Sequence, residues 1–214
     1  MISEVHNCNF MDYLKDVPDK FFDLAIADYP YRDMSENQPQ KEMRANGSMD
    51  IFGDKPTDEM YQEVIRVSKA QIIWGANNFG YPFKGFVAWD KMIRGADRYS
   101  QVEIASLSEN LSTVSRYVQI SCQGKDKFHP TTKPVELYAW LLRNYAKEGD
   151  KIFDPCLGSG SHRIAAYKLG FDFYACEINK EFYDKGQEWF ERECFGKYRL
   201  KDGRVAVQKS IFDE

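Results

Sequence analysis

Short apolar runs alternate along the chain with stretches that have the periodicity of helices. The apolar runs predict strands at 22–27, 71–75, 85–89, 103–107, 151–154 and 171–176, with a short final strand within 204–211. Helices are predicted at 134–145, 161–169 and 180–194, and the first and last of these carry an apolar stripe. Strands that alternate with helices are typical of an α/β fold, here an open, mostly parallel sheet with helices on both faces.

Residues 32–58 break this pattern. The stretch is polar, contains two prolines and two glycines, and shows no sustained period. So long a connection inside a compact domain is usually a lid, a binding loop or disordered, so we expect a mobile loop at 32–58. Neither a shift in composition nor an internal repeat divides the sequence, which predicts a single domain over residues 1–214.

Composition narrows the class of protein. Of 214 residues, 43% are hydrophobic and 15% aromatic, which favours one folded core over disorder. No window has the roughly 18 apolar residues of a membrane span, and the first six residues do not resemble a secretion signal, so we expect a cytoplasmic protein without membrane contact. The five cysteines form no CxxC pair, which favours reduced thiols and predicts no metal site.

The net charge is −4, the wrong sign for a protein that wraps nucleic acid by bulk attraction. Any such contact must therefore be local. Residues 84–133 hold eight basic and five acidic side chains, which makes the middle of the chain a candidate basic face. A solvated loop surface would explain so small an excess equally well.

A glycine-rich turn lies at residues 154–161, DPCLGSGS, between a predicted strand and a predicted helix. Glycines at such a turn let the backbone approach a ligand closely, and the helix start offers amide donors to it. The next strand ends at Glu177, 19 residues after Gly158, where a carboxylate can accept both hydroxyls of a ribose. Arg163 replaces the third glycine of a dinucleotide motif, so an adenosine ligand other than NAD is favoured, although a plain tight turn is the alternative.

Two further motifs carry polar chemistry. Asp28, Tyr29, Pro30 and Tyr31 follow the first long apolar run. A carboxylate, a stiff turn and an aromatic ring together can bind an amino group and stack on a planar base. A strand-end turn with Tyr31 packed on the core is the structural alternative. Residues 129–134, HPTTKP, form a basic, hydroxyl-rich turn that by itself could simply cap a helix.

Taken together, these motifs resemble the amino-group DNA methyltransferases, which use S-adenosylmethionine to make N6-methyladenine or N4-methylcytosine. Residues 28–31 resemble the catalytic tetrapeptide, usually Asp-Pro-Pro-Tyr, and 129–134 resemble the family's HPTxKP segment. Residues 154–161 resemble its cofactor loop, and 175–179 its ribose-binding strand end. The order of the motifs is that of the circularly permuted beta group, so the resemblance implies a Rossmann-like methyltransferase sheet.

The sequence departs from the family pattern at two positions. Tyr29 stands where the family usually has proline, and Asn9 stands where relatives often have an aspartate near the cofactor adenine. In the family, the second tetrapeptide residue acts through its main-chain carbonyl, which any residue supplies. Asn9 keeps a carbonyl oxygen that can accept a hydrogen bond. Neither change excludes activity.

The resemblance assigns roles to named residues. Asp28 and the Tyr29 carbonyl would each accept a hydrogen of the target amine, so that the nitrogen lone pair points at the sulfonium methyl. Pro30 would hold the turn, and Tyr31 would stack on a base rotated out of the duplex. The residues expected at the cofactor are Asn9, Asp28, Thr131, Lys133, Asp154, Gly158, Ser159, Gly160, Glu177, Ile178 and Asn179.

Asp28 favours adenine as the target, because relatives that act on cytosine more often carry serine at this position. The alternatives are an N4-cytosine enzyme, a family member that binds the cofactor without transfer, an NAD-linked oxidoreductase, and RNA as the substrate. The DNA contacts are expected at Lys91, Arg94, Arg98, Lys125 and Lys127. The sequence has no room for a large recognition domain, which predicts a short target-recognition region at 90–128, or a homodimer that shares the work.

Overall fold

An eight-stranded sheet forms the centre of the computed structural model, which describes residues 1–30, 55–80, 83–93, 100–111, 113–120, 128–129, 131–200 and 202–208. In order across the sheet, the strands are β1 (Ser3–His6), β8 (Asp172–Cys176), β7 (Lys151–Asp154), β2 (Phe22–Ala27), β3 (Ser68–Trp74), β5 (Val102–Leu107), β4 (Gly85–Asp90) and β6 (Val114–Val118). The first five strands in this order are parallel, β5 is antiparallel to both β3 and β4, and β6 is parallel to β4. This arrangement confirms the predicted mostly parallel α/β sheet.

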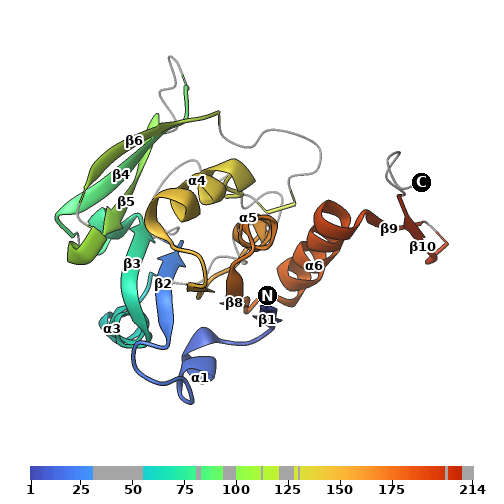
Figure 1. Ribbon diagram of the computed structural model, residues 1–214, viewed down its shortest axis with the longest axis horizontal. Coiled ribbons are helices and arrows are strands. Elements are labelled where there is room, and N and C mark those ends of the chain that lie inside the picture. Colours follow the sequence, from blue (N-terminus) through green and yellow to red (C-terminus); the bar gives the residue numbers. More distant parts are fainter. Residues whose placement is uncertain are drawn as a thin grey trace.

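Helices cover both faces of the sheet (Figure 1). Helices α1 (Phe10–Leu14) and α3 (Asp58–Val67) pack on one face, and α4 (Val135–Tyr145) and α5 (Ser161–Leu169) on the other. Helix α6 (Lys180–Phe195) lies beside α5. Two short 3-10 turns, η1 (Ala76–Asn78) and η2 (Glu109–Leu111), follow β3 and β5.

The central strand β2 separates two cores. Its side chains alternate, so that Leu24 and Ile26 join the core under α4 and α5, whereas Ala25 and Ala27 join the core under α1 and α3. A strand that is covered on both faces needs apolar side chains, and β2 is apolar without interruption from Leu24 to Ala27. The next polar position after this run is Asp28, at the carboxyl end of the strand.

Several elements were not predicted from the sequence. Strand β1 is a short strand at the sheet edge, α1 is only five residues long, and the two valines of β6 are exposed. Helix α3 does carry a readable signal, because Tyr61, Val64 and Val67 recur every three residues and Thr57 caps the helix through Met60 N. The predicted loop at 32–58 overlaps the start of this helix, and its residues 32–54 lie outside the described part of the chain.

The described part of the chain ends in a two-stranded hairpin beyond α6. Strand β9 (Lys197–Arg199) pairs in antiparallel register with β10 (Val205–Val207), and Figure 1 shows the pair at the C-terminal end of the molecule. The strand predicted within 204–211 corresponds to β10, and the partner strand β9 was not predicted.

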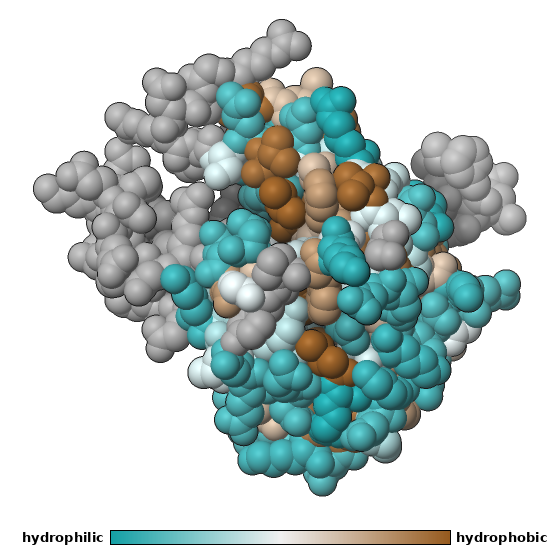
Figure 2. Space-filling view, turned by 90° about the vertical axis from the view of Figure 1, so that its left-hand side faces the viewer, coloured by the Kyte–Doolittle hydropathy of each residue, from teal (hydrophilic) through white to brown (hydrophobic). Residues whose placement is uncertain are grey.

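The outer strands of the sheet expose apolar side chains. In β6, alternate residues turn toward α4, where the Tyr117 ring contacts that of Trp140, and the residues between them face outward. Figure 2 views the molecule from this side and shows hydrophobic side chains gathered on it. The exposed apolar residues of this part of the chain are Met92, Val102, Ile104, Val114, Val118 and Ile120.

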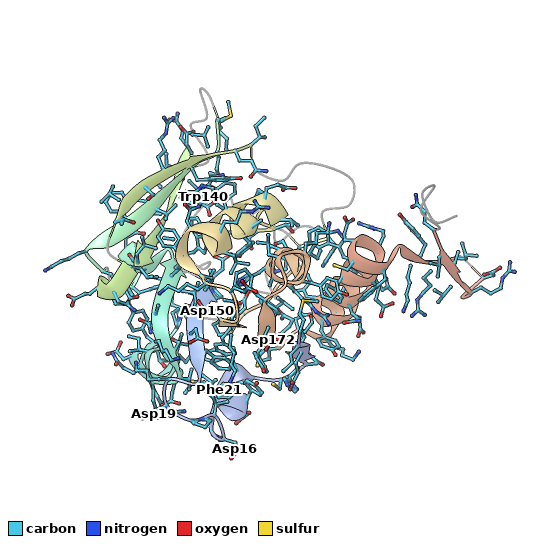
Figure 3. All side chains as sticks on the ribbon, viewed as in Figure 1. Asp16, Asp19, Phe21, Trp140, Asp150 and Asp172 are labelled. Atoms are coloured by element: carbon cyan, nitrogen blue, oxygen red, sulfur yellow. The ribbon has the colours of Figure 1, made fainter. Side chains whose placement is uncertain are left out.

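Polar side chains tie together the edge at which the parallel strands begin. Phe21, Asp150 and Asp172 mark this edge in Figure 3. Asp172 accepts a hydrogen bond from Ile2 N at 2.6 Å, and Asp23 accepts one from Lys151 N at 2.9 Å. The side chains at the opposite edge, where the strands end, are therefore available for a functional site.

None of the helices in the described part of the chain has the length and hydropathy to cross a bilayer.

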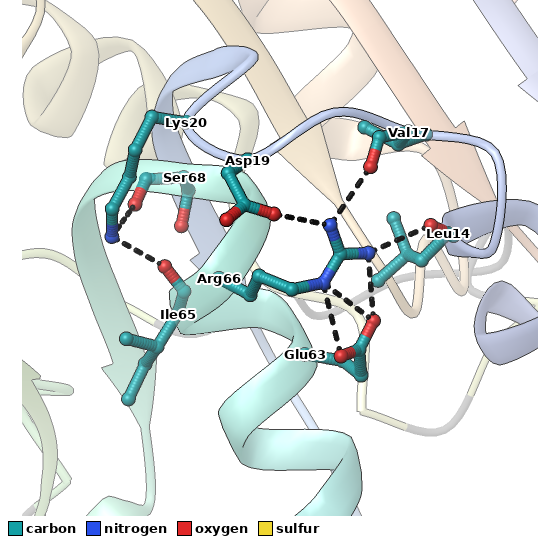
Figure 4. A network of polar contacts seen from close by, with 8 residues as sticks. All are labelled: Leu14, Val17, Asp19, Lys20, Glu63, Ile65, Arg66 and Ser68. Atoms are coloured by element: carbon teal, nitrogen blue, oxygen red, sulfur yellow. Dashed lines mark hydrogen bonds and ion pairs between the residues drawn. The ribbon is translucent and has the colours of Figure 1, made fainter.

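One guanidinium joins α3 to the connection between α1 and β2 (Figure 4). Arg66 donates to the carbonyl oxygens of Leu14 and Val17, both at 2.9 Å, and pairs with Asp19 and Glu63, both at 2.8 Å. The Leu14 carbonyl also accepts from Val17 N at 3.1 Å, so Arg66 adds a second donor to this turn. Arg66 thus fixes the chain just before it enters β2.

We expect Arg66→Met to lower the free energy of unfolding by about 1–3 kcal/mol, because two partly buried carbonyls would lose a charged donor. Urea denaturation measures this change. Lys15→Met is the matched control, since Lys15 and Asp12 form a pair whose side chains are 71% and 67% exposed, and such exposed pairs contribute little to stability. Equal stability of the two variants would contradict the prediction.

Candidate active site

Three acidic side chains meet at the carboxyl edge of the sheet. Asp28 follows β2, Asp154 ends β7 and Glu177 follows β8, and these strands are neighbours in the order β8-β7-β2. Because parallel strands end at the same edge, side chains far apart in the sequence come together there. The negative charge of Asp154 contributes to raising the pKa of Asp28 and the pKa of Glu177, so the three carboxylates lie close together.

Glu177 is bound to the glycine turn. Its Oε2 accepts from Gly158 N at 2.7 Å and its Oε1 accepts from Asn179 N at 2.8 Å, and the residue is only 7% exposed. The two backbone donors orient the carboxylate, although burial raises the pKa of Glu177 above its ordinary value. Asn7, which was not predicted, supports the same strand end by donating to the Glu177 carbonyl at 2.7 Å.

The glycine turn needs glycine for reasons of space and conformation. Gly158 has φ 58°, and a Cβ built on it would lie 3.2 Å from the ring of His129. Gly160 has φ 85° and stands at the start of α5. These glycines let the backbone of the turn pass close to whatever binds above it.

Asp154 supports the turn from within the protein. Its Oδ1 accepts from Cys156 N at 3.0 Å, and its Oδ2 lies 3.0 Å from Nδ1 of the buried His162. The His162 ring stacks on Tyr138, with ring centroids 4.6 Å apart. The sequence predicted that Asp154 contacts the cofactor. Its contacts with Cys156 and His162 place its carboxylate on the inner side of the glycine turn.

Asp28 has one oxygen bound and one available. Its Oδ2 accepts from Lys133 Nζ at 2.5 Å, whereas its Oδ1 is buried without a hydrogen-bond partner among the described residues. Burial raises the pKa of the Asp28 carboxyl to about 6, against the opposing influence of the Lys133 ammonium. The group is therefore mostly ionised at neutral pH, with one acceptor oxygen to offer.

Tyr29 points away from Asp28. Side chains alternate along an extended chain, and the Tyr29 ring is 3% exposed in the core under α1 and α3, beside Phe10 and Phe79. Burial raises the pKa of its hydroxyl well above the ordinary value, so the group is neutral. The tyrosine side chain thus contributes to packing, and only the backbone of residue 29 is at the strand end. Pro30 is partly buried, and Tyr31 lies outside the described residues.

A line of alternating charges runs outward from Asp28. Lys133, which is 3% exposed, has its Nζ 3.4 Å from Glu103 Oε2 and 5.1 Å from the centre of the Trp74 ring. Glu103 Oε1 in turn lies 3.1 Å from the amine of Lys91, which is 8% exposed. Lys133 was predicted at the cofactor and Lys91 at DNA, whereas these contacts favour a role for both in an internal ion-pair network.

Sequence reasoning missed Glu103, although the signal was present. The predicted strand at 103–107 places Glu103 on the same face as the buried residues Ala105 and Leu107. An acidic side chain on the core side of a strand requires a partner, and a basic partner is the simplest one.

Other predicted cofactor residues lie around this edge. Asn9 and Asn179 cap α1 and α6, because their Oδ1 atoms accept from Met11 N and from Glu181 N, both at 2.9 Å. Ile178 is 71% exposed, and Ser159 is buried. Thr131 is exposed, with its Oγ1 3.4 Å from His129 Nδ1. No structural observation tests their predicted roles, which stay predictions.

Four of the five predicted DNA contacts fall outside the part of the chain that the structure describes. The described residues do not include Arg94, Arg98, Lys125 or Lys127, nor parts of the predicted recognition region at 90–128.

Within the ranges that are described, no three His, Cys, Asp or Glu side chains are grouped as metal ligands would be. The partly buried thiol of Cys156 in the glycine turn has its pKa raised well above the ordinary value by burial, so it is protonated at neutral pH.

Comparisons of sequence relate the chain to DNA methylases. A family model for N6/N4 DNA methylases matches residues 18–188. Type II methyltransferase M.HpaI of Haemophilus parainfluenzae is 33% identical over 75 residues, or 35% of this chain. Type II methyltransferase M2.DpnII of Streptococcus pneumoniae is 37% identical over 65 residues, or 30% of this chain. The chain spans about a quarter of the length of these relatives, 24% in each case.

Solved structures match over most of the chain. TTHA0409 of Thermus thermophilus in complex with S-adenosyl-L-methionine gives a TM-score of 0.60 at 17% identity, covering 90% of this chain and 94% of that one. The complex of M1.HpyAVI with S-adenosylmethionine gives 0.59 at 17% identity, covering 88% and 100%. The cytosine-N4-specific PvuII DNA methyltransferase gives 0.57 at 10% identity, covering 88% and 91%. At these identities the likeness establishes the fold, which is the predicted Rossmann-like sheet.

We expect Tyr29→Ala to lower the free energy of unfolding by about 3–5 kcal/mol, because it would empty a packed part of the core. Tyr29→Phe keeps the ring and removes a hydroxyl that has no partner among the described residues, so it should change stability by no more than about 1 kcal/mol. Thermal and urea denaturation measure both. If the two variants were equally destabilised, the hydroxyl and not the ring would hold Tyr29 in place.

Proposed function

Because the chain belongs to the N6/N4 DNA methylase family, we propose that it transfers a methyl group from S-adenosylmethionine to the N6 amino group of adenine in DNA. The observation that supports this proposal most directly is the arrangement at Asp28. Its Oδ1 is a buried acceptor without a partner among the described residues, and it lies at the same strand edge as the glycine turn and Glu177.

The cofactor side of the site fits S-adenosylmethionine. Glu177 holds a fixed carboxylate for the ribose hydroxyls, and the exposed Ile178 offers an apolar surface to the adenine ring. Gly158 and Gly160 have positive φ angles and give the turn the conformation over which the methionine part would lie. When bound, the cofactor supplies a methyl group on a positively charged sulfur. Two proteins with the same fold are known as complexes with this cofactor, TTHA0409 and M1.HpyAVI.

The protein prepares the amine for methyl transfer by accepting hydrogen bonds from it. An exocyclic amine is a weak nucleophile, because its lone pair is delocalised into the ring. Asp28 Oδ1 and the Tyr29 carbonyl oxygen would each accept one hydrogen bond from the amine. These two bonds draw the nitrogen toward a pyramidal geometry. The surplus proton then passes to Asp28, whose pKa of about 6 suits it to take up and release a proton near neutral pH. Tyr31 would stack on the base.

Asp28 supports adenine as the target, since relatives that act on cytosine more often have serine at this position. An N4-cytosine target is the second candidate, because the cytosine-N4-specific PvuII enzyme has the same fold and both bases present an amine beside a ring nitrogen. A family member that binds the cofactor without transfer is a third. We further propose a single cytoplasmic domain that contacts DNA through Arg94, Arg98, Lys125 and Lys127 of the region 90–128 and through the loop at 32–58, alone or as a homodimer.

Expression in a host that lacks DNA methylation tests this function. We expect genome-wide mapping to find N6-methyladenine recurring at one short sequence, and the modification to disappear with Asp28→Asn. This variant keeps the size of the side chain and removes the charged acceptor, so transfer should fall by at least about 100-fold. Binding of S-adenosylmethionine, measured by calorimetry, should change by less than about twofold. N4-methylcytosine in place of N6-methyladenine would support the second candidate, and cofactor binding with no modified base would support the third.

The rate of transfer should fall as the pH is lowered through about 6. The pKa of Asp28 is raised mainly by burial, and the groups that face it are Lys133, Glu103, Asp154, Tyr138 and Cys156. Protonation of Asp28 below this pH removes the charged acceptor, and activity is recovered above it. Single-turnover rates between pH 5 and pH 8 measure the profile. A rate that stayed constant down to pH 5 would contradict the role of Asp28.

A further inference from the structure

Glu103 is a partly buried carboxylate that the transfer reaction described above does not use. It comes from β5, the strand that runs against the direction of its neighbours β3 and β4, so its amino end reaches the edge at which β2 and β3 end. There it contacts Lys133 at 3.4 Å on one side and Lys91 at 3.1 Å on the other. Its side chain is 22% exposed.

The pairing of Asp28 with Lys133 does not by itself require Glu103. One buried ammonium and one buried carboxylate already sum to zero charge, and burying two further charges is unfavourable unless they gain something in return. Lys91 balances the charge of Glu103, so the four groups alternate in sign and remain neutral as a set. The pair of Glu103 and Lys91 therefore adds a second contact, from Glu103, that holds the Lys133 ammonium in position.

We propose that Glu103 is a positioning residue, which holds the Lys133 ammonium against Asp28 Oδ2 so that Asp28 Oδ1 is presented to the target amine. Lysine has a flexible side chain, and a single contact would let its ammonium follow any rotation of the Asp28 carboxylate. Contacts to Asp28 and Glu103, together with the Trp74 ring at 5.1 Å, fix the ammonium from three directions. The catalytic consequence rests on the proposed function.

Glu103 also acts on Asp28 through its charge. The negative charge of Glu103 adds to the effect of burial and holds the pKa of Asp28 higher than Lys133 alone would leave it. Asp28 is thereby a better acceptor for the proton released after transfer. This electrostatic effect can be measured in the free protein, without substrate.

Three variants test the proposal. Glu103→Ala removes the second contact, and kcat for methyl transfer should fall about tenfold, while the KM for DNA and the Kd for S-adenosylmethionine change by less than about twofold. Glu103→Gln keeps an oxygen that can accept from Lys133, so it should recover most of the rate. Glu109→Gln is the matched control, because Glu109 is an exposed carboxylate just after the same strand, and it should behave as the unaltered protein.

The titration of Asp28 gives a readout that does not depend on activity. Carbon-13 NMR of its carboxyl, assigned with Asp28→Asn, should show a lower pKa in Glu103→Gln than in the unaltered protein, and an unchanged value in Glu109→Gln. The proposal is overturned if the pKa of Asp28 does not move in Glu103→Gln, or if Glu103→Ala transfers methyl groups at the original rate. It is also overturned if Glu103→Gln is as slow as Glu103→Ala, because a neutral acceptor oxygen at this position would then fail to hold Lys133 in place. If the unaltered protein methylated no DNA, the proposed function would fail, and the NMR titration would still decide whether Glu103 acts on Asp28.

Discussion

The buried ion pair between Asp28 and Lys133 is the constraint on which the rest of the site depends. The two residues are 105 positions apart and meet because β2 and the turn before α4 are held at the same edge of the sheet. Removing two charges from water is unfavourable unless they remain in contact, so the fold must place both groups to within a fraction of an ångström. The cores on either side of β2 supply that rigidity, and Arg66 fixes the chain that leads into the strand.

The sequence predicted the parts of the structure that are determined locally. The strands β2 and β7 are buried on both faces, so their apolar runs could be placed at their observed residues, 22–27 and 151–154. The polar motifs follow these strands, and the parallel arrangement then brings them to one edge. The family named on the resemblance of four motifs is confirmed by the match over residues 18–188.

The parts that sequence reasoning missed depend on contacts between distant segments. The reversed direction of β5 and the edge position of β1 follow from pairing across the sheet, which no local pattern records. The partners of Glu103 are of the same kind, because a strand pattern shows which face a side chain takes but not which charges arrive there from other elements. Lys91 and Lys133 each have the character of a ligand-binding cation in isolation, whereas their contacts with Glu103 favour a place in an ion-pair network.

Tyr29 shows how the fold separates chemistry from packing at neighbouring positions. Asp28 faces the side of the sheet that carries Lys133 and α4, and Tyr29 faces the side that carries α1 and α3. The side chain at position 29 must therefore fit beside the rings of Phe10 and Phe79. The position of its carbonyl, by contrast, is set by the backbone at the end of the strand. The replacement of the usual proline is then a change in the core, which the aromatic side chains around it accommodate. The acceptor that the reaction requires is common to every residue type, so this departure from the family pattern is compatible with transfer.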